Sequence, residues 1–187
     1  PLVKKFGNIG DTPAYWHQGD NGWQGYLTPE QYPKVFNPKN NRLWTANSRV
    51  VGGEMLKKIG NGGYALGARS QQIRDDLFSL KVFNEKSLLA VGLDDRALFL
   101  QPWQQFMLNN VLSDDLLTKE TLTQYPEFLE AKNILSADKS LSASVNSVSY
   151  RLVRNFRMNV RDLVFSELNN TLKNLNDAYQ FRSIRHQ

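Results

Sequence analysis

The clearest hydrophobic pattern lies in the last third of the chain, between residues 145 and 168. Apolar side chains recur there every three or four positions, which predicts an amphipathic helix with one buried face. Ser142 or Ser144 is expected to cap its N-terminus, because a hydroxyl oxygen accepts from the unpaired backbone N–H groups of a first turn. The apolar positions are Val145, Val148, Leu152, Val153, Phe156, Val160, Leu163, Val164 and Leu168.

The chain becomes helical in pattern from about residue 66. A helix is predicted over residues 68–80, and Asn84 is expected to cap a second one that carries Glu85 in its first turn. The apolar face of the first of these helices is formed by Ile73, Leu77 and Leu80.

Two further helices are predicted before the last one. The first covers residues 94–112, where Pro102 marks a start or a kink, and the second covers 118–135, where Pro126 interrupts the pattern. Residues 136–144 are polar and are expected to form a linker.

The first 65 residues show no helical period. They hold most of the glycines, several prolines and three of the four tryptophans, and strand-like pieces are short, as at 25–27 and 42–45. We expect a mainly α fold in two parts. Residues 1–65 form an extended arm with short strands, packed against something larger, and residues 66–187 form a bundle-like helical region.

Composition excludes several kinds of chemistry. There is no cysteine, and His17 and His186 are the only histidines, so thiolate metal sites, cysteine nucleophiles and a Ser-His-Asp triad are ruled out or unsupported. No apolar run reaches the length of a membrane span. The chain begins at Pro1 without an initiator Met or a signal-peptide pattern, so we expect it to be an internal piece of a longer protein.

A net charge of +5 raises the question of an anionic partner. Four arginines share the polar face of the last predicted helix, which suits either a nucleic-acid or partner-binding module or a solvated face paired with Asp162 and Glu167. We favour the second interpretation and expect no nucleic-acid partner, because aromatic side chains do not alternate with the basic ones. The arginines are Arg151, Arg154, Arg157 and Arg161.

Two other groups of residues are candidates for chemistry. Asp94 and Asp95 are adjacent carboxylates, but neighbouring helical positions point about 100° apart, so a helix cap with an ion pair to Arg96 is the better interpretation than an acid–base pair. Aromatic residues of the arm either line an apolar pocket or anchor the arm, and their pattern does not separate these alternatives. They are Tyr15, Trp16, Trp23, Tyr26 and Tyr32.

An ordered set of short stretches resembles the penicillin acylase (penicillin amidase) family of N-terminal-nucleophile hydrolases. No single stretch is decisive, but their order and spacing together resemble the large β-subunit of that family. The stretches are WQGYL at 23–27, PKVFNP at 33–38, RLWTANSRVV at 42–51, GYALGAR at 63–69 with QIRD at 72–75, LDDRALFL at 93–100 and SVSYRLVRNFR at 147–157.

This resemblance implies amide hydrolysis within a four-layer αββα fold. In the family, a serine at the N-terminus of the β-subunit attacks the amide, and its own α-amino group takes the proton. That serine and the α-subunit are expected outside these residues, so the chain alone is expected to be inactive. The expected partners are the rest of the same precursor and an N-acyl substrate, either a β-lactam side chain or an N-acyl-homoserine lactone. A periplasmic or secreted location follows from the same resemblance.

Two site residues follow from the resemblance. The stretch Thr45 to Arg49 matches the family's oxyanion-hole sequence, which makes Asn47 the candidate donor to the oxyanion. Without the resemblance, Asn47 would be interpreted as a turn residue. Arg69 matches the family's arginine that orders the active site, and as a cation in a first helical turn it is slightly unfavourable against the helix dipole, which supports a specific role.

The chain also departs from the family pattern. Ser48 stands where a second Asn is common, and Lys58 stands where some members have a carboxylate for structural calcium, so no metal or other cofactor is expected. The substrate-binding residues cannot be assigned from the sequence, and the hypothesis that Trp44, Arg49 and Val50 approach the acyl site does not rest on the family pattern. Because apolar faces left open tend to be covered by association, we expect a homo-oligomer or a loosely packed arm.

Overall fold

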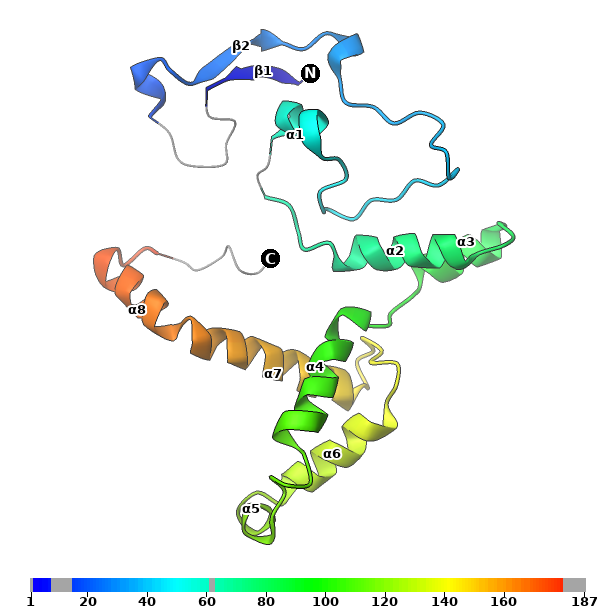
Figure 1. The fold of residues 1–187 in the computed structure, drawn as a ribbon, viewed down its shortest axis with the longest axis vertical. Helices are drawn as coiled ribbons and strands as arrows, with labels where there is room; N and C mark the ends of the chain where they lie inside the picture. Colours follow the sequence, from blue (N-terminus) through cyan, green and yellow to red (C-terminus); the bar gives the residue numbers. More distant parts are fainter. Residues whose placement is uncertain (1, 8–14, 61–62, 180–187) are drawn as a thin grey trace. The chain divides into compact units, whose positions relative to one another are not determined.

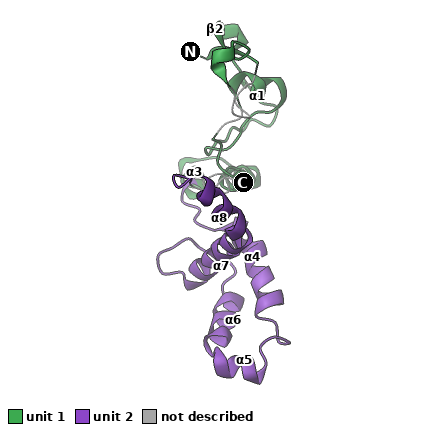
Figure 2. Ribbon diagram, turned by 90° about the vertical axis from the view of Figure 1, so that its left-hand side faces the viewer, with its two compact units in different colours: residues 1–91, 182–187 green, residues 92–181 purple. Residues whose placement is uncertain are grey.

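The computed structural model describes residues 2–7, 15–60 and 63–179, and the chain divides between Val91 and Gly92 into two compact units (Figures 1 and 2). Helices dominate the described part, and the strands there form one small sheet. The prediction of a mainly α fold is therefore confirmed. The predicted change to helix at residue 66 lies within unit 1, and each unit is described by itself below.

The sheet of unit 1 is an antiparallel pair, β1 (Val3–Phe6) and β2 (Gly22–Tyr26). The ladder is interrupted between Val3 and Lys5, and the Nζ atom of Lys5 donates to the Ile59 carbonyl at 3.2 Å. This hydrogen bond ties the sheet to the end of α1 (Gly53–Ile59), a short helix that the sequence pattern did not predict.

The two strand predictions for the arm had different outcomes. Residues 25–27 overlap the end of β2, but residues 42–45 belong to no strand. Leu43, Trp44 and Thr45 are residue types that suit a strand, yet no neighbouring strand pairs with the backbone of residues 42–45 in the described structure. Arg42 bonds instead to the end of a helix, at the Leu77 carbonyl, and Trp44 packs on Phe78 of the same helix.

The two remaining helices of unit 1 match their predictions. Helix α2 (Ala68–Ser79) occupies the predicted range, and α3 (Glu85–Gly92) follows Asn84 as expected. The Asn84 side-chain oxygen accepts from the Ser87 N–H at 2.8 Å, and the Ser87 hydroxyl accepts from the Asn84 N–H at 3.0 Å. This reciprocal pair satisfies two of the unpaired donors of a helix start.

Unit 1 has little apolar core. No apolar side chain among its described residues is fully buried, and many large ones are exposed, such as Phe36 at 79% and Trp23 at 62%. Polar contacts therefore carry much of its internal structure, including Thr28 and Gln31, which form a capping box around the short 3-10 helix η2 (Pro29–Gln31).

Unit 2 contains the buried core and most of the helices. Leu135, Leu141 and Val153 are completely buried, and Leu100, Met107 and Leu112 are nearly so. The elements are η3 (Leu98–Leu100), α4 (Gln101–Phe106), the π-helical turn η4 (Met107–Val111), α5 (Lys119–Gln124), α6 (Glu127–Ala137), α7 (Val148–Val164) and α8 (Ser166–Leu175).

Four helix boundaries differ from the sequence pattern. The predicted helix 94–112 begins only at η3, because residues 95 to 97 bond to residues 141 to 143: the Ala97 N–H donates to the Leu141 carbonyl at 3.1 Å, and the Ala143 N–H donates to the Asp95 carbonyl at 2.8 Å. Pro102 lies in the first turn of α4, as predicted.

Proline and capping explain two of the other three differences. The predicted helix 118–135 is two helices, because the residue before Pro126 is forced out of the helical region: Tyr125 has φ −134°. The last predicted helix is capped by Ser147, not by Ser142 or Ser144. The Ser147 hydroxyl accepts from the Tyr150 N–H at 3.2 Å. The helix also breaks at Phe165, where α8 begins anew.

A buried glutamine joins the helices of unit 2. Gln104 of α4 is 4% exposed, and its Nε2 atom donates to the carbonyl oxygens of Leu135 at 2.7 Å and of Asp138 at 2.6 Å. Both carbonyls belong to the C-terminal end of α6, where backbone acceptors lack helical partners. Gln104 therefore satisfies buried acceptors while fixing α4 against α6.

The linker after α6 is organised by the carboxylate of Asp138. One oxygen accepts from the Ser140 N–H at 2.9 Å and from the Leu141 N–H at 3.1 Å, and the other accepts from the Ser149 hydroxyl of α7. Leu141 has a positive φ of 49°, which is unfavourable for a leucine, yet its side chain is fully buried. The carboxylate thus holds a strained residue so that its side chain fills the core.

These hydrogen bonds lower the pKa of Asp138 from its usual 3.8 to about 2, with the Ser149 hydroxyl as the largest cause. Because the folded-state pKa is lower than that of the unfolded chain, the carboxylate stabilises the fold above about pH 4, and this contribution is lost as the pH falls toward 2.

We predict that Asp138→Asn lowers the free energy of unfolding by roughly 1–3 kcal/mol at pH 7, the usual worth of a hydrogen bond to a charged group. Urea unfolding at several pH values should show the gap between wild type and variant narrowing from pH 4 to pH 2. Asp115→Asn, at an exposed carboxylate, is the control. A gap that stays constant with pH would contradict this role of the charge.

Candidate functional site

Asn47 lies in a tight turn in front of helix α2. Its backbone is left-handed, with φ 57°, a conformation that asparagine adopts more readily than most other residues with a side chain. The Asn47 carbonyl accepts from the Ala65 N–H at 2.8 Å. The backbone geometry therefore favours Asn at this position even before its side chain is considered.

The structure brings the two predicted site residues together. The Arg69 Nη2 atom, in the first turn of α2, donates to the Asn47 Oδ1 atom at 2.5 Å, and both side chains are exposed. A guanidinium has only donors, so the atom facing it is the amide oxygen. The Nδ2 atom donates to no acceptor among the described residues, and its two N–H groups are available to an external oxygen.

Next to this pair, a second contact joins the same two segments. Ser48 is 7% exposed, and its hydroxyl lies 2.7 Å from that of Ser70, which itself donates to the Gly67 carbonyl at 3.2 Å. Ser48 departs from the family pattern in sequence, but its side chain is buried and its hydroxyl has a hydrogen-bond partner. Sequence reasoning did not identify Ser70. Asn47 and Arg69 are 22 residues apart, and so are Ser48 and Ser70. Once Asn47 is paired with Arg69, the same spacing places Ser70 beside Ser48.

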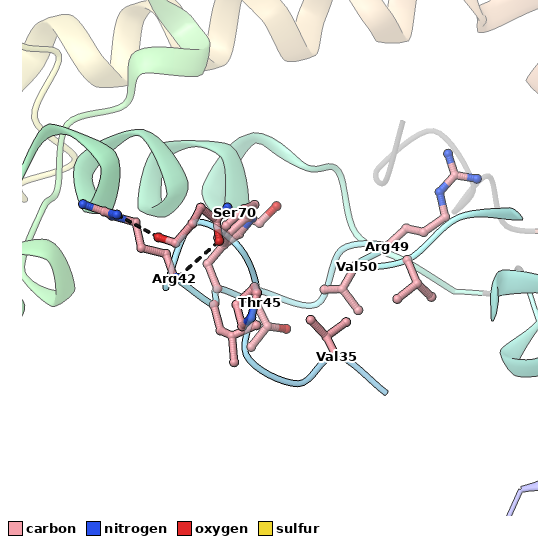
Figure 3. A pocket seen from close by; sticks show the side chains of 11 residues that line it. Val35, Arg42, Thr45, Arg49, Val50 and Ser70 are labelled. Carbon is pink, nitrogen blue, oxygen red and sulfur yellow. Dashed lines mark hydrogen bonds between the residues drawn. The ribbon is translucent and has the colours of Figure 1, made fainter. Parts of the chain in front are cut away.

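An open pocket of about 560 Å³ lies beside the turn (Figure 3). Trp44, Arg49 and Val50, the residues hypothesised to approach an acyl site, all line it, whereas Asn47 and Arg69 do not. The side chains of Val35 and Val50 point toward each other, and Arg49 extends away from them. The volume falls within the range of small-molecule sites. The other lining residues are Pro38, Asn40, Arg42, Leu43, Thr45, Val51 and Ser70.

The other candidates of the sequence have structural partners. Arg96 forms the expected ion pair with Asp94 at 2.7 Å, whereas Asp95 accepts from the Ser142 hydroxyl at 2.6 Å. The two carboxylates thus bind different partners. The expected helix cap is wrong, because the first helical residue is Leu98 and Ala97 precedes it.

The arginine face of α7 is engaged largely by the chain itself. The Arg157 guanidinium lies 4.9 Å from the centre of the Phe99 ring, and burial is the main effect that lowers its pKa. Arg161 pairs with Asp162, and Arg151 donates to the Val145 carbonyl at 2.7 Å. Of the two carboxylates expected to pair with this face, Asp162 does so through Arg161, and the expectation of no nucleic-acid partner stays a prediction.

The aromatic residues of the arm contact one another and remain open to solvent. Trp16 and Trp23 pack edge to face with ring centres 5.6 Å apart, and Tyr15 packs in the same way on His17. Neither tryptophan lines the pocket beside Asn47. The choice between anchor and ligand wall stays open for them.

The described residues form no metal cluster and no membrane-spanning helix. Among the described residues, no group of three His, Asp or Glu side chains has the arrangement of metal ligands. Lys58, at the position where some relatives have a calcium ligand, donates to the Gln31 carbonyl at 3.1 Å. No helix in the described ranges combines the length and the apolar character that crossing a membrane requires.

The backbone of Asn47 generates a prediction about stability. Asn47→Ala should lower the free energy of unfolding by about 1–2 kcal/mol, because alanine is strained in the left-handed region. Asn47→Gly and Asn47→Asp should be close to wild type in thermal unfolding, since glycine and aspartate tolerate this conformation. Equal losses for all three variants would contradict a backbone requirement.

Nearly the whole chain resembles one known protein family. A sequence model of the family described as penicillin amidase matches residues 1–185, nearly the entire length, and the match includes Asn47, Arg69 and the pocket. No curated protein and no solved structure gives a significant match. The coverage of the family match is sufficient to assign membership: the chain belongs to the penicillin amidase family.

Proposed function

We propose that these residues stabilise the oxyanion in an amide hydrolase of the N-terminal-nucleophile type. The observation that carries the proposal is the hydrogen bond from Arg69 to the Asn47 side-chain oxygen. It fixes the amide and leaves the two Nδ2 N–H groups for the substrate. Donors held in place before the reaction stabilise developing negative charge without reorganisation.

Arg69 contributes in two ways. Its guanidinium orients the Asn47 amide, and its positive charge polarises that amide through the shared hydrogen bond, so that the N–H groups become stronger donors. Arg69 does not itself need to touch the substrate, since its guanidinium donates to Asn47. The two residues thus act as a unit in which Asn47 contacts the reacting oxygen.

The attacking group is proposed to be a serine at the N-terminus of a processed subunit, outside these 187 residues. Its Oγ atom bonds to the amide carbon while its α-amino group takes the hydroxyl proton. The carbonyl oxygen becomes the oxyanion that Asn47 binds. Collapse of the intermediate breaks the C–N bond, the proton passes to the leaving amine, and water then hydrolyses the acyl ester.

The substrate class is proposed to be an N-acyl compound, such as a β-lactam with an acyl side chain or an N-acyl-homoserine lactone. The apolar walls of the pocket beside Asn47, with Trp44 and Val50, suit the acyl part. The remainder of the precursor is the proposed partner, and a periplasmic or secreted location accords with such substrates.

We predict that Asn47→Asp in the complete enzyme lowers kcat by about 10²–10³-fold, the usual effect of losing one oxyanion donor. Aspartate keeps the turn and the acceptor for Arg69 but has no N–H. KM should change little, because the interaction forms in the transition state. Asn37→Asp is a matched control, since Asn37 also has a positive φ, 44°, and is exposed. Initial rates on a panel of N-acyl substrates provide the measurement, and unchanged kcat would remove the assignment.

We also predict that the native gene product is a two-chain enzyme whose β-subunit begins with serine, and that the 187-residue chain alone has no acylase activity. Intact-mass spectrometry with N-terminal sequencing tests the first statement, and the same substrate panel tests the second. An unprocessed single chain, or turnover by these residues alone, would contradict the proposal that the nucleophile lies outside the 187 residues.

A further inference from the structure

The segment that carries Asn47 is attached to helix α2 at both ends. Asn47 and Ser48 bind Arg69 and Ser70 at the start of the helix, and Arg42 binds the far end. The Arg42 Nε atom donates to the Leu77 carbonyl at 2.9 Å, and its Nη2 atom donates to the Leu80 carbonyl at 3.4 Å.

The Arg42 guanidinium also contacts two phenylalanine rings and a backbone carbonyl of its own loop. It lies 5.0 Å from the ring centres of both Phe78 and Phe83, and its Nη1 atom donates to the Asn40 carbonyl at 2.8 Å. Between the two attachments, Trp44 packs edge to face on Phe78 with ring centres 5.9 Å apart. The segment therefore runs antiparallel to α2, with Arg42 as its anchor at the C-terminal end.

Residues 42–48 are longer, when extended, than the stretch of α2 that they follow, and Arg42 restrains them. Six residue steps separate Arg42 from Ser48 and can span about 20 Å when extended. The helical distance from Ser70 to Leu77 is only about 10 Å, at about 1.5 Å per residue. A segment attached only at the Asn47 end could therefore shift along the helix. The bonds of Asn47 to Arg69 and Ala65 and of Ser48 to Ser70 all lie at this one end, so Arg42 supplies the second fixed point that opposes such a shift.

We propose that Arg42 is a positioning residue for the Asn47 donor: by binding the C-terminal carbonyls of α2 it sets the register of residues 42–48, and thereby the place of the Asn47 amide. This inference rests on the proposed role of Asn47 in the reaction. An arginine suits the task because its planar fork bonds two carbonyls and stacks on rings at once, which a lysine ammonium does not do.

The first test is a double-mutant cycle in the complete enzyme. Arg42→Ala should lower kcat by about 10- to 10²-fold with KM nearly unchanged, since small displacements of a catalytic group are costly, and Arg42→Lys should restore part of the loss. In the Asn47→Asp background, Arg42→Ala should have less than about a two-fold further effect, because residues that act as a unit are not additive. Arg74→Ala, at an exposed arginine of the same helix paired with Asp75, should leave kcat unchanged.

The outcomes distinguish a failure of the proposed role of Asn47 from a failure of the positioning role of Arg42. If Asn47→Asp alone leaves kcat unchanged, the proposed function fails and the role of Arg42 falls with it. If Asn47→Asp lowers kcat but Arg42→Ala has no effect, or has its full effect in both backgrounds, only the positioning role is overturned. In the last case Arg42 acts on stability, or on another part of the site.

The second test needs no catalysis. Native-state hydrogen exchange should show the Ala65 amide, which donates to the Asn47 carbonyl, exchanging at least about ten-fold faster in Arg42→Ala. The Gln71 amide, which donates to the Gly67 carbonyl within the first turn of α2, should keep its rate. Unchanged exchange at Ala65, or equal acceleration at both amides, would overturn the proposal.

Discussion

The hydrogen bond from the Arg69 guanidinium to the Asn47 oxygen is the interaction on which the proposed chemistry of this chain depends. An exposed amide without such a partner would rotate about its side-chain torsions and present oxygen or nitrogen to a substrate. A guanidinium accepts nothing, so it selects the amide oxygen and leaves the nitrogen to donate. The geometry at a single contact, 2.5 Å long, thus decides what Asn47 can do.

The two units are stabilised by different kinds of contact. Unit 2 has fully buried leucine and valine side chains, with Gln104 and Asp138 joining the helix ends around them. Unit 1 has no such core among its described residues, and the turn with Asn47 is held by side-chain bonds of Arg42 and Ser48 to α2 and by the backbone bond from Ala65. Polar contacts are directional, so they position a donor well. They contribute less to stability than apolar burial does, because the same groups bond to water when unfolded.

Several features could be predicted from the sequence because they depend on local patterns. Helix α2 and the Asn84 cap follow from spacing and from the chemistry of one side chain. The break before Pro126 was visible as a proline, but two separate helices were not anticipated. The start at Ser147 could not be chosen over Ser142 or Ser144, because all three hydroxyls suit a cap and the bonds of Ser142 to Asp95 come from tertiary structure.

For the site, the sequence by itself determined the residue types, their spacing and, through resemblance, the pair Asn47 and Arg69. Only the tertiary structure decided that Arg69 meets the oxygen of Asn47, that Ser48 is buried against Ser70, and that Arg42 binds the end of α2. It also decided that Leu141, in a linker that looked polar, fills the core. The physical reason is that a local pattern specifies which face a residue occupies, whereas partners separated by 22 or 35 residues meet only when the intervening chain has folded.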